Sequence, residues 1–86
     1  MKYRRLPSFK RAFSRLPHEI QLKAGKAFLL FRENPKHPSL RIKRVRGVAG
    51  VWEGRIDIRY RFTFHYEDDT AVFRNIGPHN IMERNP

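Results

Sequence analysis

The chain of 86 residues contains no cysteine, which excludes disulfide bonds and thiolate metal sites. Acidic residues are also few, 8 against 19 lysines and arginines, so the formal net charge is +11. Long apolar runs are absent, and the longest run, Ala27–Phe31, is too short for a secretory signal or a membrane span. These absences predict a protein of the reducing cytoplasm that contacts no membrane.

The excess of positive charge indicates a polyanionic partner. Most of the basic residues are arginines, whose planar guanidinium group suits phosphate better than the ammonium group of lysine. The arginines concentrate in predicted strands and loops rather than along one helical stripe. This distribution disfavours a basic helix that lies on a membrane surface.

The first part of the chain has helical periodicity after a short opening strand at residues 3–6. Ser8 is the expected N-cap of a first helix, which Pro17 ends, with apolar residues at i, i+3, i+4 and i+7. A second helix is expected from Pro17 to the Asn34-Pro35 stop. Its core stripe consists of Ile20, Ala24, Ala27, Phe28 and Phe31.

Three leucines of the second helix, Leu22, Leu29 and Leu30, lie off that stripe. A helix placed between its neighbour and a sheet has two apolar sides, which would bury these leucines. The alternative is a groove that binds a helix of a partner protein.

The second part of the chain alternates apolar and polar residues, as strands do. Residues 40–45 predict a short strand with a basic outer side, and residues 51–66 predict a two-stranded ribbon. In the second half of the ribbon, alternate side chains share one face and are expected to be buried: Tyr60, Phe62, Phe64 and Tyr66. In the first half, the side chains that share a face and are expected to point inward are Trp52, Ile56 and Ile58. Pairing of the two halves would place Arg55 and Arg61 on one exposed face.

Residues 67–70 predict a turn, and residues 71–76 predict a last strand in which Val72, Arg74 and Ile76 share one parity. His79 then follows a predicted Gly77-Pro78 turn. Trp52 is expected to pack at the rim of the core, with base stacking as the alternative. His18, His37 and His65 are expected to have structural roles, because none has metal-ligand spacing.

The fold class expected from this pattern is α+β, in one domain of residues 1–86. It would have a helical half at about 8–34, a strand half at about 40–76 and a tail at 77–86. Two N-terminal helices should pack on one face of a small twisted, mainly antiparallel sheet, in the order β-α-α-β-β-β-β. The opposite face should be basic, and the opening strand should pair in parallel with a later one.

This element order, together with WEGRI, YRF and IGPH in the second half, resembles the RelE/ParE superfamily of bacterial toxin–antitoxin toxins over nearly the whole chain. In the ribonuclease branch, which includes RelE-, YoeB-, YafQ- and HigB-like toxins, these places hold phosphate-binding arginines and often a catalytic histidine. The matching residues here are Arg55, Arg61 and His79. The chain departs from the branch at Asn80 and Glu83, where an aromatic residue often follows the histidine, and Glu53 does not clearly match the YoeB-like carboxylate base.

The resemblance implies a ribosome-dependent mRNA endoribonuclease that is inhibited by a cognate acidic antitoxin. The residues implied for antitoxin binding are Leu22, Leu29 and Leu30. Two alternatives remain: a ParE-like inhibitor of DNA gyrase, which shares the fold without the catalytic set, and a basic nucleic-acid-binding module without activity.

The residue types also suit this chemistry. Cleavage of RNA without a metal needs a base for the 2′-OH proton, an acid for the 5′-oxygen and cations around the phosphorane, and it leaves a 2′,3′-cyclic phosphate. His79 is a candidate acid or base because imidazole titrates near neutrality. The carboxylate candidates are Glu53, Asp57 and Glu83. The residues expected to bind the RNA backbone are Arg41, Lys43, Arg44, Arg46 and Arg59. We expect no metal and no cofactor.

Overall fold

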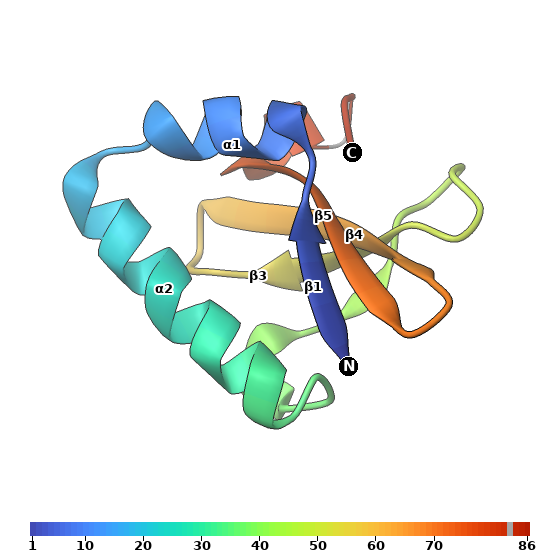
Figure 1. Ribbon diagram of the computed structural model, residues 1–86. Coiled ribbons are helices and arrows are strands. Elements are labelled where there is room, and N and C mark those ends of the chain that lie inside the picture. The colour runs from blue at the N-terminus through green and yellow to red at the C-terminus, as the bar shows by residue number, and fades with distance from the viewer. Residues whose placement is uncertain (83) are drawn as a thin grey trace.

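The computed structural model describes residues 1–82 and 84–86 and has the expected α+β architecture (Figure 1). Five strands form one sheet in the order β1-β5-β4-β3-β2, in which β1 pairs with β5 in parallel and the other neighbours are antiparallel. The strands are β1 Lys2–Arg5, β2 Lys43–Arg44, β3 Trp52–Arg55, β4 Tyr60–Glu67 and β5 Thr70–Pro78. The helices are α1 Pro7–Ser14, α2 His18–Glu33, the 3-10 turn η1 Pro38–Leu40 and α3 His79–Met82. The parallel opening strand is therefore confirmed.

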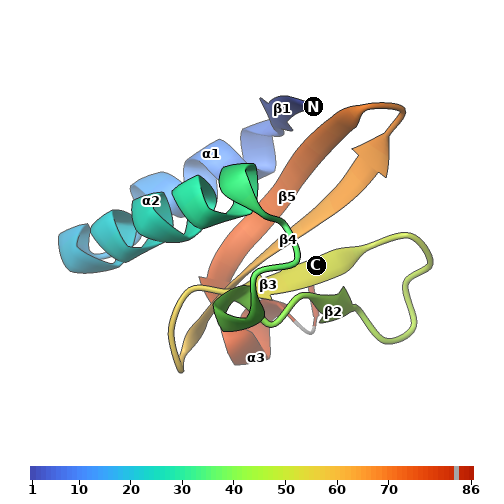
Figure 2. The same ribbon diagram turned by 90° about the horizontal axis from the view of Figure 1, so that it is seen from below.

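Both long helices cover one face of the sheet, and α3 lies on the other side of the strands (Figure 2). The core between helices and sheet is aromatic. Phe31 of α2 contacts Phe62 and Phe64 of β4 and Phe73 of β5, with ring centroids 4.9–6.1 Å apart. The predicted stripe of α2 is the buried face, although Phe28 is only partly buried. Among the described residues, no helix is long and apolar enough to cross a membrane.

Two local predictions in the first half of the chain were wrong. Leu6, not Ser8, is the N-cap of α1, because Pro7 takes the first helical position, where its missing N–H costs nothing. The Ser8 hydroxyl instead donates to the Arg74 carbonyl at 2.7 Å. Leu40 lies in η1 rather than in a strand, and the left-handed Arg41 (φ 47°) that follows leaves β2 with only two residues.

The predicted ribbon is confirmed, but fewer of its apolar residues are buried than expected. Phe62 and Phe64 are buried, whereas Tyr60 is half-buried and Tyr66 is 43% exposed, because the end of β4 extends beyond the helices. Ile58 is 76% exposed because it lies in the turn between β3 and β4. The inward face of β3 therefore has Trp52 and Gly54, together with the partly buried Ile56 that follows the strand.

Strand β5 does not keep the predicted single parity. Thr63 pairs with Asn75 and Phe64 pairs with Phe73, so Arg74 is the extra residue of a β-bulge. The bulge brings Phe73 and Ile76 into the same core although their spacing is odd. Gly77 and Pro78 lie in β5 instead of forming a turn, so His79 directly follows the strand.

Gly54 allows the close contact between β3 and the core. A Cβ atom at this position would clash with the ring of Phe62 and would lie 2.9 Å from Cδ1 of Ile42. Glycine is therefore required here for space, and the bulky ring of Phe62 can fill the volume above the strand.

Candidate active site

Strands β3 and β4 present a set of polar side chains on the face opposite the long helices. The register pairs Glu53 with Thr63 and Arg55 with Arg61. Residues of this parity alternate with Gly54 and Phe62, which face the core, so the strand positions of all four belong to the second face. Arg55, at the end of β3, also lines a pocket beside Lys23 and Lys26 of α2. The two arginines expected to share a face are direct cross-strand partners.

The turn between β3 and β4 holds both arginines by its backbone. The carbonyl of Asp57 accepts from Nη1 of Arg61 at 2.6 Å and from Nε of Arg55 at 3.3 Å, and the Tyr60 carbonyl accepts from Nη1 of Arg61 at 3.0 Å. These bonds engage one nitrogen of each guanidinium group. A guanidinium group has five N–H donors on three nitrogens, so each arginine keeps donors with which it can bind a phosphate.

The carboxylate of Asp57 fixes the turn itself. Its Oδ1 accepts from the backbone amides of Arg59 and Tyr60, both at 2.9 Å, and its Oδ2 lies 3.5 Å from Nζ of Lys23 on α2. Burial acts to raise the pKa of Asp57, but the two amides and Lys23 together lower it below its usual value. Asp57, a candidate base from the sequence, is therefore a structural residue of the turn.

This arrangement predicts an acid-sensitive contribution to stability. Because the folded pKa of Asp57 lies below the unfolded value, its contribution is present above the unfolded pKa and is lost as the pH falls through the folded pKa. We expect Asp57→Ala to lower the free energy of unfolding at pH 7 by about 1–3 kcal/mol, typical of hydrogen bonds to a charged group. Urea denaturation from pH 7 to pH 3 measures this. The difference between wild type and variant should shrink at low pH, and a constant difference would contradict the assignment.

A groove of about 600 Å³ brings together the other candidate residues. Glu53 of β3 and His79 of α3 both line it, although they are far apart in the sequence. The backbone N–H of His79 donates to the Arg59 carbonyl at 2.7 Å, which ties the start of α3 to the β3–β4 turn. The rest of the lining comes from β2 and the loop after it, and consists of Lys43, Arg44, Val45 and Arg46.

Glu53 is the most buried charged group of this groove. Its side chain is 8% exposed, and Oε1 lies 3.5 Å from Nζ of Lys43, its cross-strand neighbour. The groove therefore combines a carboxylate, an imidazole and several cations, which are the groups that acid–base chemistry at a phosphate requires.

The second face of the sheet is less open than expected. Thr63 and Met82 are buried, and the chain end lies near β5. The side chain of Asn75 donates to the Asn85 carbonyl at 2.8 Å, and Nε of Arg74 donates to the Pro86 carbonyl at 3.3 Å. The C-terminal segment thus covers part of the face, and the basic residues surround the groove at its edge.

His65 has the structural role expected for it. Its Nε2 lies 2.8 Å from Oε2 of Glu67, and its Nδ1 lies 2.9 Å from Nη1 of Arg74. The hydrogen bond from His65 is the main cause that lowers the pKa of Glu67, and Arg4, 2.9 Å from the same oxygen, adds to it. The sequence did not indicate this network, because it depends on the bulge at Arg74.

The predicted RNA-binding residues divide between two sides of the β2–β3 pair. Lys43, Arg44 and Arg46 line the groove, whereas Arg41 lines a separate pocket on the helix side. Arg59 is exposed in the turn beside His79. Glu83 lies outside the described residues. Within the described part of the chain, no three His, Asp or Glu side chains gather closely enough to hold a metal ion.

Comparison with known proteins finds no matching family model and no matching curated protein. Solved structures do match. YafQ from E. coli strain BL21(DE3) has a TM-score of 0.78 at 10% identity, over 94% of this chain and 96% of that one. The YoeB/ParE toxin from Agrobacterium tumefaciens has a TM-score of 0.76 at 18% identity, over 92% and 99%.

A third match is the RelB-RelE antitoxin-toxin complex from Methanococcus jannaschii, with a TM-score of 0.75 at 16% identity over 94% of this chain and 95% of that one. In all three, nearly the whole of both chains superimposes. The fold inferred from the element order and the WEGRI, YRF and IGPH segments is therefore confirmed: this chain has the same fold as these YafQ, YoeB/ParE and RelE structures.

Proposed function

We propose that this chain is the toxin of a toxin–antitoxin pair and that it acts as an mRNA endoribonuclease on the ribosome, in the cytoplasm. The observation that carries the proposal is the groove that Glu53 and His79 both line, beside Lys43, Arg44 and Arg46. The fold shared with YafQ, YoeB/ParE and RelE proteins supports it. Residues 1–86 act as one domain in this proposal, because the helices and the strands pack around a shared hydrophobic core.

In the proposed reaction, Glu53 takes the proton of a 2′-OH group, and the 2′-oxygen attacks the adjacent phosphorus. The bond from phosphorus to the 5′-oxygen breaks, and His79 protonates the leaving oxygen. The products are a 2′,3′-cyclic phosphate and a 5′-OH. Arg55 and Arg61, held by the carbonyl of Asp57, bind the phosphate and stabilise the charge of the phosphorane. No metal or cofactor enters these steps.

The RNA backbone is bound by the basic side chains of the groove and the turn, which are Lys43, Arg44, Arg46 and Arg59, and by Arg41 on the helix side of the β2–β3 edge. The ribosome supplies the alignment of the 2′-OH group, which a small site of this kind cannot enforce alone.

The test is cleavage of mRNA on programmed ribosomes by the purified protein, either untreated or stripped of metal with EDTA and then freed of the chelator, because the ribosome itself needs Mg²⁺. We expect equal cutting by both preparations, with cyclic phosphate ends on the upstream fragments. Intact mRNA together with inhibited DNA gyrase would favour the ParE-like alternative. Intact mRNA with RNA binding alone would favour the non-catalytic module.

We further propose that an acidic antitoxin covers the exposed side of α2. Leu22 and Leu29 are 58% and 60% exposed and lie seven residues apart, so they share one face of the helix. The prediction that a second apolar side of α2 is buried was thus wrong for these two residues, while Leu30 packs partly against the core at the edge of the same side. The RelE and YafQ relatives were solved with the antitoxins RelB and DinJ.

Changing Leu22 and Leu29 together to glutamate should weaken antitoxin binding by about 30- to 1,000-fold, because apolar anchors at an interface each contribute on the order of 1–2 kcal/mol. Calorimetric titration with the product of the neighbouring gene measures this, and thermal denaturation should show an unchanged fold. Lys10→Glu on the exposed side of α1 is the control for the change in charge. Equal affinity of all three proteins would move the antitoxin to another surface.

A further inference from the structure

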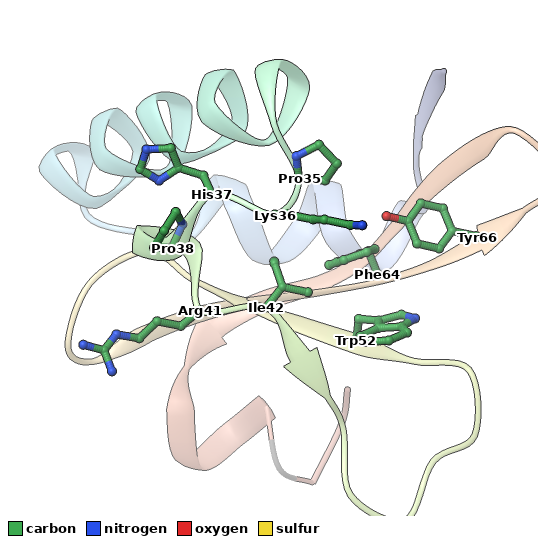
Figure 3. A pocket seen from close by; sticks show the side chains of 9 residues that line it. All are labelled: Pro35, Lys36, His37, Pro38, Arg41, Ile42, Trp52, Phe64 and Tyr66. Carbon is green, nitrogen blue, oxygen red and sulfur yellow. The ribbon is translucent and has the colours of Figure 1, made fainter.

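A second pocket, of about 510 Å³, lies on the helix side of the sheet, across the β2–β3 edge from the groove. Its floor is Ile42 and Phe64, and Trp52 and Tyr66 line it from β3 and β4 (Figure 3). The loop Pro35–Pro38 forms the opposite wall, from which Lys36 extends toward Tyr66. The volume lies within the range of small-molecule binding sites.

The aromatic side chains of the pocket are accessible to a ligand. Tyr66 is 43% exposed and meets Phe64 edge to face, with ring centroids 5.5 Å apart, so the ring is held in position by the core beneath it. Trp52 is half-buried and is the cross-strand partner of Phe64. Two fixed rings beside an opening are a typical platform for nucleobases.

The charged side chains of the pocket are all basic. Lys36 and Arg41 line it, and Arg41 points away from the aromatic residues toward the surface (Figure 3). The guanidinium group of Arg44 lies over the ring of Trp52, 5.1 Å from its centroid, and Arg44 also lines the groove that contains Glu53 and His79. No carboxylate lines the pocket among the described residues, so its charge complements an anion.

The geometry points to a nucleotide subsite of single-stranded RNA in this pocket. The RNA strand crosses the short edge strand β2, with phosphates bound by Arg44 and Lys36 and one base packed against Tyr66 and Trp52. The two basic surfaces on either side of β2 then form one continuous track, which explains why Arg41 lies in a separate pocket while Arg44 lines the groove and also contacts Trp52. This subsite deepens the proposed function, because RNA is the substrate proposed for the groove.

The single tryptophan of the chain makes the binding directly measurable. Short 2′-O-methyl RNA oligonucleotides cannot be cut through the 2′-OH, so their binding is independent of cleavage. We expect them to quench the fluorescence of Trp52 in the full chain. An oligonucleotide of equal charge without bases should bind through its phosphates and quench little.

Tyr66→Ala should weaken binding of the base-containing oligonucleotide by about 5- to 100-fold, as lost base stacking does, and Tyr66→Phe should restore it. Lys36→Ala should reduce the slope of log affinity against log salt by about 0.7, the value of one phosphate contact on a single strand. Lys26→Ala on the exposed side of α2 is the matched control, and this variant should bind the oligonucleotide with the affinity and salt dependence of wild type.

Unchanged Trp52 fluorescence on saturation, or equal affinities of wild type and Tyr66→Ala, would overturn the subsite. Quenching by an acidic peptide with an aromatic residue, at lower concentration than by the oligonucleotide, would assign the pocket to a protein partner and also overturn it. If mRNA is cut on the ribosome while the pocket binds no base, the subsite fails and the proposed function stands. If the pocket binds a base but mRNA is not cut on the ribosome, the subsite stands and the proposed function fails.

Discussion

Replacing His79 by alanine should reduce mRNA cleavage on programmed ribosomes by about 10²–10⁴-fold, the usual effect of removing a proton-transfer group. Glu53→Gln should cause a loss of similar size, because it keeps the shape of the side chain and its place beside Lys43 but removes the base. The double variant should be little slower than either single variant, since groups that act as a unit are not additive. Single-turnover cleavage rates measure all three.

The matched control for this experiment is His18→Ala, which removes an exposed histidine at the start of α2. It should cut as wild type does. Arg61→Ala should also lose activity, by about 10²–10³-fold, because its guanidinium group stabilises the charge of the phosphorane. Thermal denaturation should show that each variant is folded. Wild-type cutting by His79→Ala would remove His79 from the mechanism.

Phe62→Ala should have the largest effect on stability, a loss of about 3–5 kcal/mol in the free energy of unfolding. The side chain of Phe62 is fully buried, and its ring contacts those of Phe28, Phe31, Phe64 and Phe73. A chain of this size has a total stability of only about 5–15 kcal/mol, so the variant should be partly unfolded near body temperature. Urea denaturation at 25 °C measures the difference.

Ile58→Ala is the control for this loss, because Ile58 is apolar but lies exposed in the turn, and it should change stability by less than about 0.5 kcal/mol. Gly54→Ala tests the same contact from the strand side and should cost about 1–3 kcal/mol through overpacking against Phe62. Phe62→Leu in the Gly54→Ala background should recover part of that cost. A cost below 1 kcal/mol for Phe62→Ala would show that the aromatic core is placed wrongly.

Local periodicity in the sequence predicted which side of most elements is buried. On α2, the spacing of the helical turn directs four residues toward the core: Ile20, Ala24, Ala27 and Phe31. On β4, the alternation of side chains buries Phe62 and Phe64. These predictions depend only on neighbouring residues, so the sequence contains all that they require. The turn after β4 was predictable for the same reason, and its Asp68 adopts a left-handed conformation (φ 53°).

Predictions failed where distant segments decide the outcome. The exposure of Tyr66 follows from where the helices end above the sheet, and that of Ile58 follows from its place in the β3–β4 turn. The bulge at Arg74 follows from how β5 must shift to place both Phe73 and Ile76 in the core. Asp57 was a candidate base by residue type, but its bonds to the amides of the turn give it a structural role.

The sequence by itself determined the charge of the protein, its helical and strand halves, and the residue types that could act on a phosphate. Only the tertiary structure placed Arg55 opposite Arg61 and brought His79 to the groove of Glu53. The physical reason is that the period of a strand fixes the face of a side chain but not its partner. Strand register, the bulge and the path of α3 depend on packing between segments far apart in the chain, and these decide which side chains meet.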